Sequence, residues 1–151
     1  MQTTSEGDDA SPRPRPAPDR SLLAGLRVLI VEDDGDSRDI LATMLREYGA
    51  NVSTAESAAE ALAAIEAGAP DALISDIGMP EMDGYAFIAE LRRRPRDKGG
   101  AVPAVALTAY TEEGSRTRAI AAGFQEHLSK PADPQALVAV VARLTNRRPT
   151  P

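Results

Sequence analysis

Polar side chains of the kinds that carry out phosphoryl chemistry follow several short apolar runs of the chain. Glu32 and Asp33 follow the first run, Asp76 and Thr108 stand at the ends of two later runs, and Lys130 follows the last. Carboxylates held within a few ångströms of one another repel, and a hard divalent cation such as Mg²⁺ relieves that repulsion. A hydroxyl donor and an ammonium group complete the parts needed to transfer a phosphoryl group to a carboxylate. These residue types predict Mg²⁺-dependent phosphoryl transfer, provided that the fold brings them together.

The run at 26–31 is nearly continuous and has the length and composition of a strand that is buried on both faces. A weak second strand is expected at 52–55, and further strands at 72–75, 103–107 and 124–129. Between them lie segments with the apolar spacing of helices, such as the segment that Gly49 ends. Strands that alternate with helices in this way predict a doubly wound α/β fold, in which five parallel strands form a sheet with helices on both faces.

Capping residues mark where the predicted helices begin. The expected N-terminal caps are Asp34 or Asp36, Ser57 with Glu60 in a capping box, Asp83, Thr111, and Asp133 followed by Pro134. The helix after Thr111 has Ile120 as its one large apolar residue, which predicts weak attachment to the sheet. We expect the basic run at 92–98 to lie in solvent at a helix C-terminus, where it complements the helix dipole.

Folds of this class bind ligands outside the carboxyl ends of their strands. The strand-end residues therefore meet at one edge of the predicted sheet. Lys130 and Lys98 are the two lysines of the chain, so an ammonium group at position 130 is not explained by general lysine usage. We expect Asp34 to cap a helix and leave it out of the metal site.

Length and composition exclude several classes of protein. The chain has 151 residues, enough for one domain, and its formal net charge of -6 disfavours binding to nucleic acid. It has no cysteine and a single histidine, His127, which excludes disulfides, thiol catalysis and multi-histidine metal sites. It shows neither an apolar run of membrane-spanning length nor a signal peptide. We expect a cytoplasmic protein that binds neither nucleic acid nor membrane.

The two ends of the chain differ in composition from the middle. Prolines alternate with arginine and alanine in the N-terminal segment, which favours an extended linker that cannot bury a core. We expect a disordered tail at 1–22, a folded domain at 23–146 and a C-terminal tail at 147–151. A docking role for the proline- and arginine-rich segment is the alternative to a solvated linker.

Four motifs resemble those of response regulator receiver domains, the phosphoacceptor modules of two-component signalling. They are Glu32-Asp33 after LIV, SDIGMPEMDGY at 75–85, ALTAY at 106–110 and Ser129-Lys130-Pro131. The resemblance covers about 26–144, nearly all of the part expected to fold. It implies a flavodoxin-like fold with strand order 2-1-3-4-5.

The resemblance also implies how the acidic residues act. Asp76 would accept a phosphoryl group from the phosphohistidine of a sensor histidine kinase or of a histidine phosphotransfer protein. The Mg²⁺ ligands would be Asp33, Asp76, Glu32 through a water molecule, and the backbone carbonyl of Gly78. Gly78 lies two residues after the acceptor, where a side chain often affects dephosphorylation, so the resemblance leaves the lifetime of the phosphate open.

Three further positions follow from the same resemblance. Thr108 and Lys130 would contact the phosphoryl group, and the peptide before Pro131 is commonly cis in this family. The family's switch residue, three positions before the lysine, is usually Tyr or Phe, and here it is His127. An imidazole can still turn inward behind Thr108, but it is more polar and titrates near neutral pH. This departure predicts a weaker or pH-dependent coupling between phosphorylation and output.

The resulting hypothesis is a phosphorylation switch that catalyses only its own phosphorylation and dephosphorylation. Phosphorylation would alter a protein-binding face made of the helix that ends at Gly123, the strand at 124–129 and the helix that begins after Asp133. The output protein is unknown, and the chain would be a monomer or a weak phosphorylation-dependent dimer.

Other functions compete with this hypothesis. One alternative is a receiver module of a hybrid histidine kinase in a phosphorelay. The motifs ALTAY and SKP resemble those of receivers of the hybrid type and favour this alternative. Another is an aspartate-nucleophile phosphatase, suggested by Asp34-Gly35-Asp36. Against it, Arg38 stands where Thr or Val is expected, and the chain has no room for a cap domain. A binding module with a decayed site is disfavoured, because every expected functional group except the switch aromatic is present.

Overall fold

The computed structural model describes residues 20–109 and 114–146 and shows a five-stranded parallel sheet. The strands are β1 (Arg27–Val31), β2 (Asn51–Ala55), β3 (Ala72–Asp76), β4 (Ala104–Thr108) and β5 (Glu126–Ser129). They lie in the order β2-β1-β3-β4-β5, which confirms the predicted order. In the sheet register Asp76 lies beside Leu107, and Thr108 lies beside Ser129. The carboxyl ends of the strands therefore meet at one edge.

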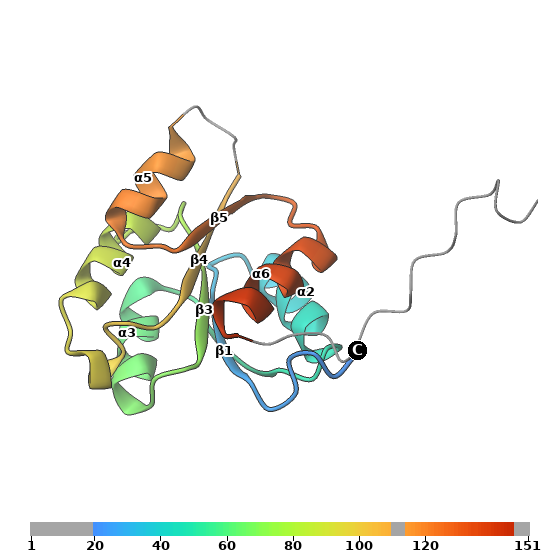
Figure 1. Ribbon diagram of the computed structural model, residues 1–151. Coiled ribbons are helices and arrows are strands. Elements are labelled where there is room, and N and C mark those ends of the chain that lie inside the picture. The colour runs from blue at the N-terminus through green and yellow to red at the C-terminus, as the bar shows by residue number, and fades with distance from the viewer. Residues whose placement is uncertain (1–19, 110–113, 147–151) are drawn as a thin grey trace, which may run out of the picture.

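Helices cover both faces of this sheet (Figure 1). On one face lie α2 (Gly35–Arg46) and α6 (Pro134–Leu144), and on the other lie α3 (Ala58–Ala67), α4 (Gly84–Arg92) and α5 (Ser115–Ala122). A short 3₁₀ turn that the sequence did not predict, η1 (Arg96–Lys98), follows α4. The doubly wound α/β fold is confirmed. Within the described part of the chain, no helix is both long and apolar enough to cross a membrane.

Alternating side chains of the central strands divide the core into two layers. Ile30 packs in the layer that holds Leu45 of α2 and Val141 of α6, and all three are fully buried. Its neighbour Val31 packs in the opposite layer with Phe87 of α4. Each buried side chain of this size stabilises the fold by about 1.5–3 kcal/mol. The layers hold β1, β3 and β4 in place, and with them the residues at the strand ends.

Most of the expected helix caps are present. The side chains of Asp34, Ser57, Asp83 and Asp133 each accept a hydrogen bond from a backbone N–H of the first helical turn. Each bond satisfies a donor that the helix itself leaves without a partner. Asp34 rather than Asp36 caps α2, because its carboxylate accepts from the N–H of Ser37 at 2.9 Å.

The predicted boundaries between β4 and β5 need correction. Helix α5 begins at Ser115, directly after Gly114. The predicted cap Thr111 lies outside the described residues. Strand β5 begins at Glu126 rather than at 124, because the N–H of Phe124 bonds to the carbonyl of Ala119 at the end of α5.

Helix α5 is held to the rest of the protein by little apolar surface. Ile120 is 42% exposed and does not anchor the helix. The buried residue of α5 is the small Ala119. This arrangement agrees with the weak attachment that the sequence predicts.

The basic run that begins at the last residue of α4 was expected to be solvated, and this is wrong for two of its arginines. Arg92 is half-buried and donates hydrogen bonds to the carbonyl oxygens of Gly100 and Gly123 and to Oε1 of Gln125. Burial lowers its pKa. Arg94 donates to a backbone carbonyl of α3. These arginines hold neighbouring segments together, because buried carbonyl groups need donors.

Candidate functional site

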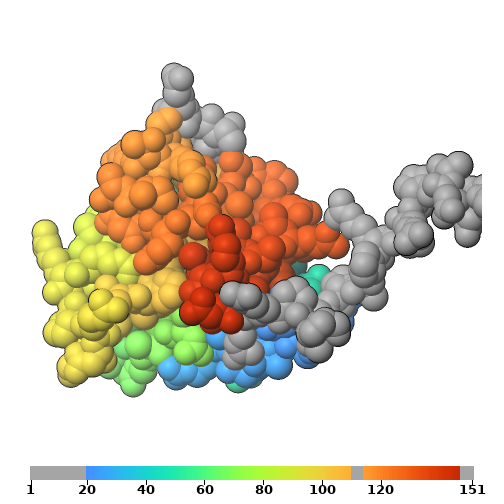
Figure 2. Space-filling model, in the orientation of Figure 1, coloured from blue at the N-terminus to red at the C-terminus, as the bar shows by residue number. Residues whose placement is uncertain are grey.

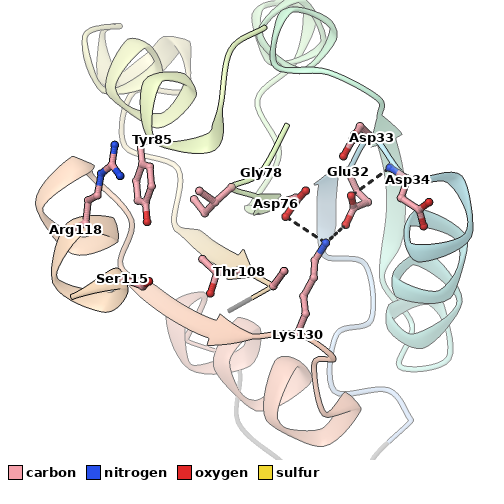
Figure 3. A pocket seen from close by; sticks show the side chains of 12 residues that line it. Glu32, Asp33, Asp34, Asp76, Gly78, Tyr85, Thr108, Ser115, Arg118 and Lys130 are labelled. Atoms are coloured by element: carbon pink, nitrogen blue, oxygen red, sulfur yellow. Dashed lines mark hydrogen bonds and ion pairs between the residues drawn. The ribbon is translucent and has the colours of Figure 1, made fainter. Parts of the chain in front are cut away.

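The strand ends and the loops that follow them enclose a pocket of about 440 Å³. The residues predicted to form the site line this pocket: Glu32, Asp33, Asp76, Gly78, Thr108 and Lys130. Figure 3 shows the side chains converging from β1, β3, β4 and the end of β5. His127 does not line the pocket and reaches it through Thr108. The fold therefore brings together residues that are far apart in the sequence.

The ammonium group of Lys130 lies between two carboxylates. Its Nζ donates to Oε1 of Glu32 at 2.6 Å and lies 3.2 Å from Oδ1 of Asp76 (Figure 3). The backbone N–H of Lys130 donates to the carbonyl of Thr108 at 2.7 Å, and its peptide bond to Pro131 is cis. Burial lowers the pKa of Lys130, but the hydrogen bond to Glu32 and the charge of Asp76 outweigh burial. The pKa is therefore raised, and the amine stays charged.

Glu32 is fixed by protein donors on both of its oxygens. It is 1% exposed; Oε1 accepts from Lys130, and Oε2 accepts from the backbone N–H of Asp34 at 3.2 Å. Burial raises the pKa of Glu32, and the hydrogen bond from Lys130 opposes that rise. Its carboxylate therefore keeps one position at the floor of the pocket.

Three carboxylates form a cluster of the metal-binding type. One oxygen each of Glu32, Asp33 and Asp76 lie within 4.8 Å of one another. Asp33 is exposed and the other two are buried, so the cluster opens to solvent at Asp33. Asp34 also lines the pocket, but its carboxylate caps α2, and the hydrogen bond from Ser37 lowers its pKa. Hard oxygen donors at this spacing suit a small divalent cation.

The two predicted switch residues are joined directly. Oγ1 of Thr108 and Nε2 of His127 lie 2.8 Å apart in a hydrogen bond. Thr108 is buried at the end of β4, and His127 is half-buried on the neighbouring strand β5. Burial lowers the pKa of His127, and the charge of Arg116 lowers it further. The imidazole is therefore neutral at pH 7.

Arg38 belongs to the site, a role that the sequence did not predict. Its Nη1 donates to the backbone carbonyl of Glu32 at 2.9 Å. The contact runs from the first turn of α2 back to the end of β1, and it fixes the peptide that presents Asp33. A basic residue one turn after an acidic strand end is the signal that points to this role.

The sequence also did not predict the residues that form the far wall of the pocket. It is formed by Tyr85 of α4 and by Ser115 and Arg118 of α5. The guanidinium of Arg118 lies over the Tyr85 ring, 4.0 Å from its centre (Figure 3). These residues lie in the first turn or two of the helices that follow β3 and β4. Their places after the strand ends are the sequence signal, because such helices start at the pocket.

Two glycines after Asp76 differ sharply in the space around them. The N–H of Gly84 donates to the carbonyl of Ile77 at 2.8 Å, which folds the loop back on the strand. A Cβ at Gly84 would lie 2.6 Å from the carbonyl oxygen of Asp76, whereas one at Gly78 would meet nothing within 4 Å. Close packing of Gly84 therefore helps to set the backbone of Asp76.

We predict that Gly84→Ala lowers the free energy of unfolding by about 2 kcal/mol, because the new methyl group overlaps backbone atoms that cannot move freely. Gly78→Ala is the matched control, and we expect a change of less than about 0.5 kcal/mol. Urea unfolding measures both. Equal losses in the two variants would contradict the packing described around Gly84.

The parallel sheet with an acidic pocket at its carboxyl edge defines a protein of the flavodoxin-like receiver class. The family described as the response regulator receiver domain matches residues 28–142. The chain belongs to this family, whose members are phosphoacceptor modules of two-component signalling. The recognition made from the four motifs is thereby confirmed.

Sequence relatives agree with this assignment. An uncharacterized 14.6 kDa protein of Leptolyngbya boryana is 46% identical over 119 residues, which are 79% of this chain and 89% of that protein. The transcriptional regulatory protein PrrA of Mycobacterium tuberculosis is 38% identical over 122 residues, 81% of this chain. The match spans 51% of PrrA, about half of its length.

Solved structures show the same fold. A putative response regulator from Chloroflexus aurantiacus has a TM-score of 0.76 at 36% identity, with 81% of this chain and 98% of that chain covered. The receiver domain of the sensor histidine kinase PA1611 from Pseudomonas aeruginosa has a TM-score of 0.74 at 31% identity, with 82% and 99% covered. That structure is described with a magnesium ion coordinated in its active-site cleft.

Proposed function

We propose that this chain accepts a phosphoryl group from a phosphohistidine onto Asp76 in an Mg²⁺-dependent reaction. The observation that supports this most strongly is the position of Lys130, held by Glu32 with its Nζ 3.2 Å from Oδ1 of Asp76. An ammonium group so placed contacts a phosphoryl oxygen on Asp76 without leaving its partner Glu32. The pocket gives a donor access to the same carboxylate.

The donor set at this site fits Mg²⁺, which prefers oxygen ligands and keeps several waters. Asp33 and Asp76 would bind the ion directly, as would the backbone carbonyl of Gly78. Glu32 would act through water, since its two oxygens already hold protein donors. When bound, Mg²⁺ neutralises carboxylate and phosphoryl oxygens that otherwise repel. The magnesium described in the PA1611 receiver domain supports the choice of ion.

The side chains of the pocket have distinct parts in the transfer. A carboxylate oxygen of Asp76 attacks the phosphorus, the P–N bond of the donor phosphohistidine breaks, and its electron pair returns to the donor's imidazole. Lys130 neutralises charge on the phosphoryl oxygens during transfer. Thr108 donates its hydroxyl to one of them. The acyl phosphate so formed on Asp76 is the signal.

The chain turns over no separate substrate in this proposal. Asp34 caps α2 and Arg38 is bonded to the Glu32 carbonyl, so neither serves the phosphatase alternative. The test counts inorganic phosphate released from acetyl phosphate per chain. We expect release no faster than hydrolysis of the phosphorylated protein. Continuous rapid release would favour the aspartate-nucleophile phosphatase instead.

A second hollow supports docking of the phosphodonor protein. It has a volume of about 310 Å³ and lies beside the pocket, between α2 and the loop after β5. Lys130 lines both hollows, and Ile40, Met44 and Pro131 line the second. Ile40 is 62% exposed. An exposed apolar surface beside Asp76 suits a protein that must bring a phosphohistidine to it. We assign this surface to the sensor histidine kinase or histidine phosphotransfer protein.

We predict that Ile40→Asp slows phosphotransfer from the cognate kinase by about tenfold or more, because it places a charge in an apolar interface. Phosphorylation by acetyl phosphate stays at the wild-type rate. Ile120→Asp is the control, since Ile120 is also exposed but lies on α5. Gel separation of phosphorylated and free protein measures both rates. Unchanged kinase transfer in Ile40→Asp would place the docking surface elsewhere.

We assign the output surface to α5, β5 and α6, which lie side by side in orange and red in Figure 2. Arg116 of α5 and Arg143 of α6 both pair with Glu126 of β5. The helices are thereby linked across the strand. Because α5 buries little apolar surface, it is the element most easily shifted by phosphorylation.

The partner of this surface is an output protein, or a second copy of the chain in a weak phosphorylation-dependent dimer. The net charge of -6 supports a protein partner over nucleic acid.

The whole protein in which this receiver works is a separate proposal. The sensor histidine kinase CheAY of Helicobacter pylori is 33% identical over 118 residues, which are 14% of that protein. This likeness supports the hybrid-kinase alternative, and transfer from Asp76 to a histidine phosphotransfer protein would test it. We also propose that the chain consists of a tail at 1–22, a domain at 23–146 and a tail at 147–151.

A further inference from the structure

We propose that His127 is a positioning residue that holds the hydroxyl hydrogen of Thr108 in the unphosphorylated protein. Thr108 then has to break its hydrogen bond to the imidazole before its hydroxyl can donate to a phosphoryl group on Asp76. The inference rests on the proposed function and extends it, because it makes His127 a competitor of the phosphoryl group.

The contact has the length of an ordinary hydrogen bond. Oγ1 of Thr108 and Nε2 of His127 are 2.8 Å apart, within the range for a hydroxyl and a ring nitrogen. The two side chains reach each other from adjacent strands, where His127 is in register with Ala106. Thr108 is 7% exposed and lines the pocket beside Asp76. Thr108 therefore connects the imidazole to the pocket that holds Asp76.

The relative basicity of the imidazole nitrogen and the hydroxyl oxygen decides which group donates. A neutral imidazole has one nitrogen with a free lone pair, and this nitrogen is a far stronger base than an alcohol oxygen. The favoured bond is therefore O–H to Nε2, with the proton of the ring on Nδ1. The ring is neutral because burial lowers the pKa of His127 and the nearby Arg116 of α5 lowers it further. Glu126 on the same strand opposes this shift, but it is itself paired with Arg116 and with Arg143 of α6.

A hydroxyl has one hydrogen and cannot give it to two acceptors at once. A phosphoryl oxygen carries charge and is the stronger acceptor, so Thr108 turns to it when Asp76 is phosphorylated. His127 then loses its partner, next to the ion pairs that link α5 and α6 through Glu126. Competition with His127 weakens phosphoryl binding. Release of the ring then alters the contacts of the output surface beside it.

The first test measures how tightly beryllofluoride, an analogue of the phosphoryl group, binds in the presence of Mg²⁺. We expect His127→Phe to bind about fivefold more tightly than wild type, because the imidazole no longer competes for the Thr108 hydroxyl. His127→Gln offers an amide oxygen to Thr108 and should restore binding close to wild type. The difference between wild type and His127→Phe shrinks as the pH falls, because an imidazolium cannot accept. Equal or weaker binding by His127→Phe overturns the proposal.

The second test needs no phosphoryl group. His127 is the single histidine of the chain, so its ring nitrogens are assigned without ambiguity by long-range ¹H–¹⁵N NMR. We expect an unprotonated Nε2 in wild type and a changed Nε2 shift in Thr108→Val. A proton on Nε2, or no change in Thr108→Val, overturns the inference whatever the phosphorylation assays give. Failure of wild type and all variants to bind beryllofluoride, with the expected NMR result, overturns the proposed function and the competition together.

Discussion

Replacing Lys130 with methionine slows phosphorylation by acetyl phosphate by about 100-fold or more. The Nζ of Lys130 lies 2.6 Å from Glu32 and 3.2 Å from Asp76, so it neutralises both carboxylates and can contact the phosphoryl group. Methionine keeps the apolar stem and removes the charge. Glu32, which is 1% exposed, then loses its cation, and its pKa rises further. The rate is followed by intact-mass spectrometry at fixed Mg²⁺.

Lys98→Met is the matched control for this change. Lys98 is the other lysine of the chain and is exposed in η1. Both variants lose one positive charge, so an effect of net charge on the approach of the donor would slow both. We expect Lys98→Met to react at the wild-type rate. Equal rates for Lys130→Met and wild type would exclude Lys130 from the transfer.

Replacing Asp33 with asparagine weakens Mg²⁺ binding by about tenfold or more. Asp33 is the exposed member of the acidic cluster, whereas the oxygens of Glu32 already hold protein donors. Asparagine keeps the size of the side chain and removes the charge that attracts the ion. The chain has no tryptophan, so the affinity is measured by NMR titration of backbone amides near Gly78.

Asp34→Asn controls for the loss of one negative charge at the pocket. Asp34 is adjacent in sequence and lines the same pocket, but its carboxylate caps α2. Asparagine is also a good N-terminal cap, so the helix is retained. We expect an Mg²⁺ affinity within about twofold of wild type. Similar losses in Asp33→Asn and Asp34→Asn would mean that the pocket attracts the ion only through its overall charge.

The sheet and its functional edge could be predicted because they follow from local patterns. Continuous apolar runs identified the buried strands, and caps such as Ser57 and Asp83 marked where the helices begin. Parallel strands place their carboxyl ends at one edge, which brings Asp33, Asp76 and Lys130 to one pocket once the strands are known. The strand order itself came from the family resemblance.

The pairings within the site could not be predicted in the same way. The bonds between Thr108 and His127, and between Arg38 and the Glu32 carbonyl, depend on side-chain conformations that sequence spacing does not determine. Arg92 looked like a solvated helix end, and its burial depends on three segments that meet only in the fold. The helix α5 begins after Gly114, whereas the sequence favours Thr111, a good cap by type that lies outside the described residues.

Phosphorylation of Asp76 is tested most directly by intact-mass spectrometry of wild type and Asp76→Asn after incubation with acetyl phosphate and Mg²⁺. We predict one phosphoryl adduct on wild type, no adduct when Mg²⁺ is withheld, and none on Asp76→Asn. An adduct of equal yield on Asp76→Asn would contradict the assignment of the acceptor. Absence of any adduct on wild type, with Mg²⁺ shown to bind, would contradict phosphoryl transfer from such a donor at this site.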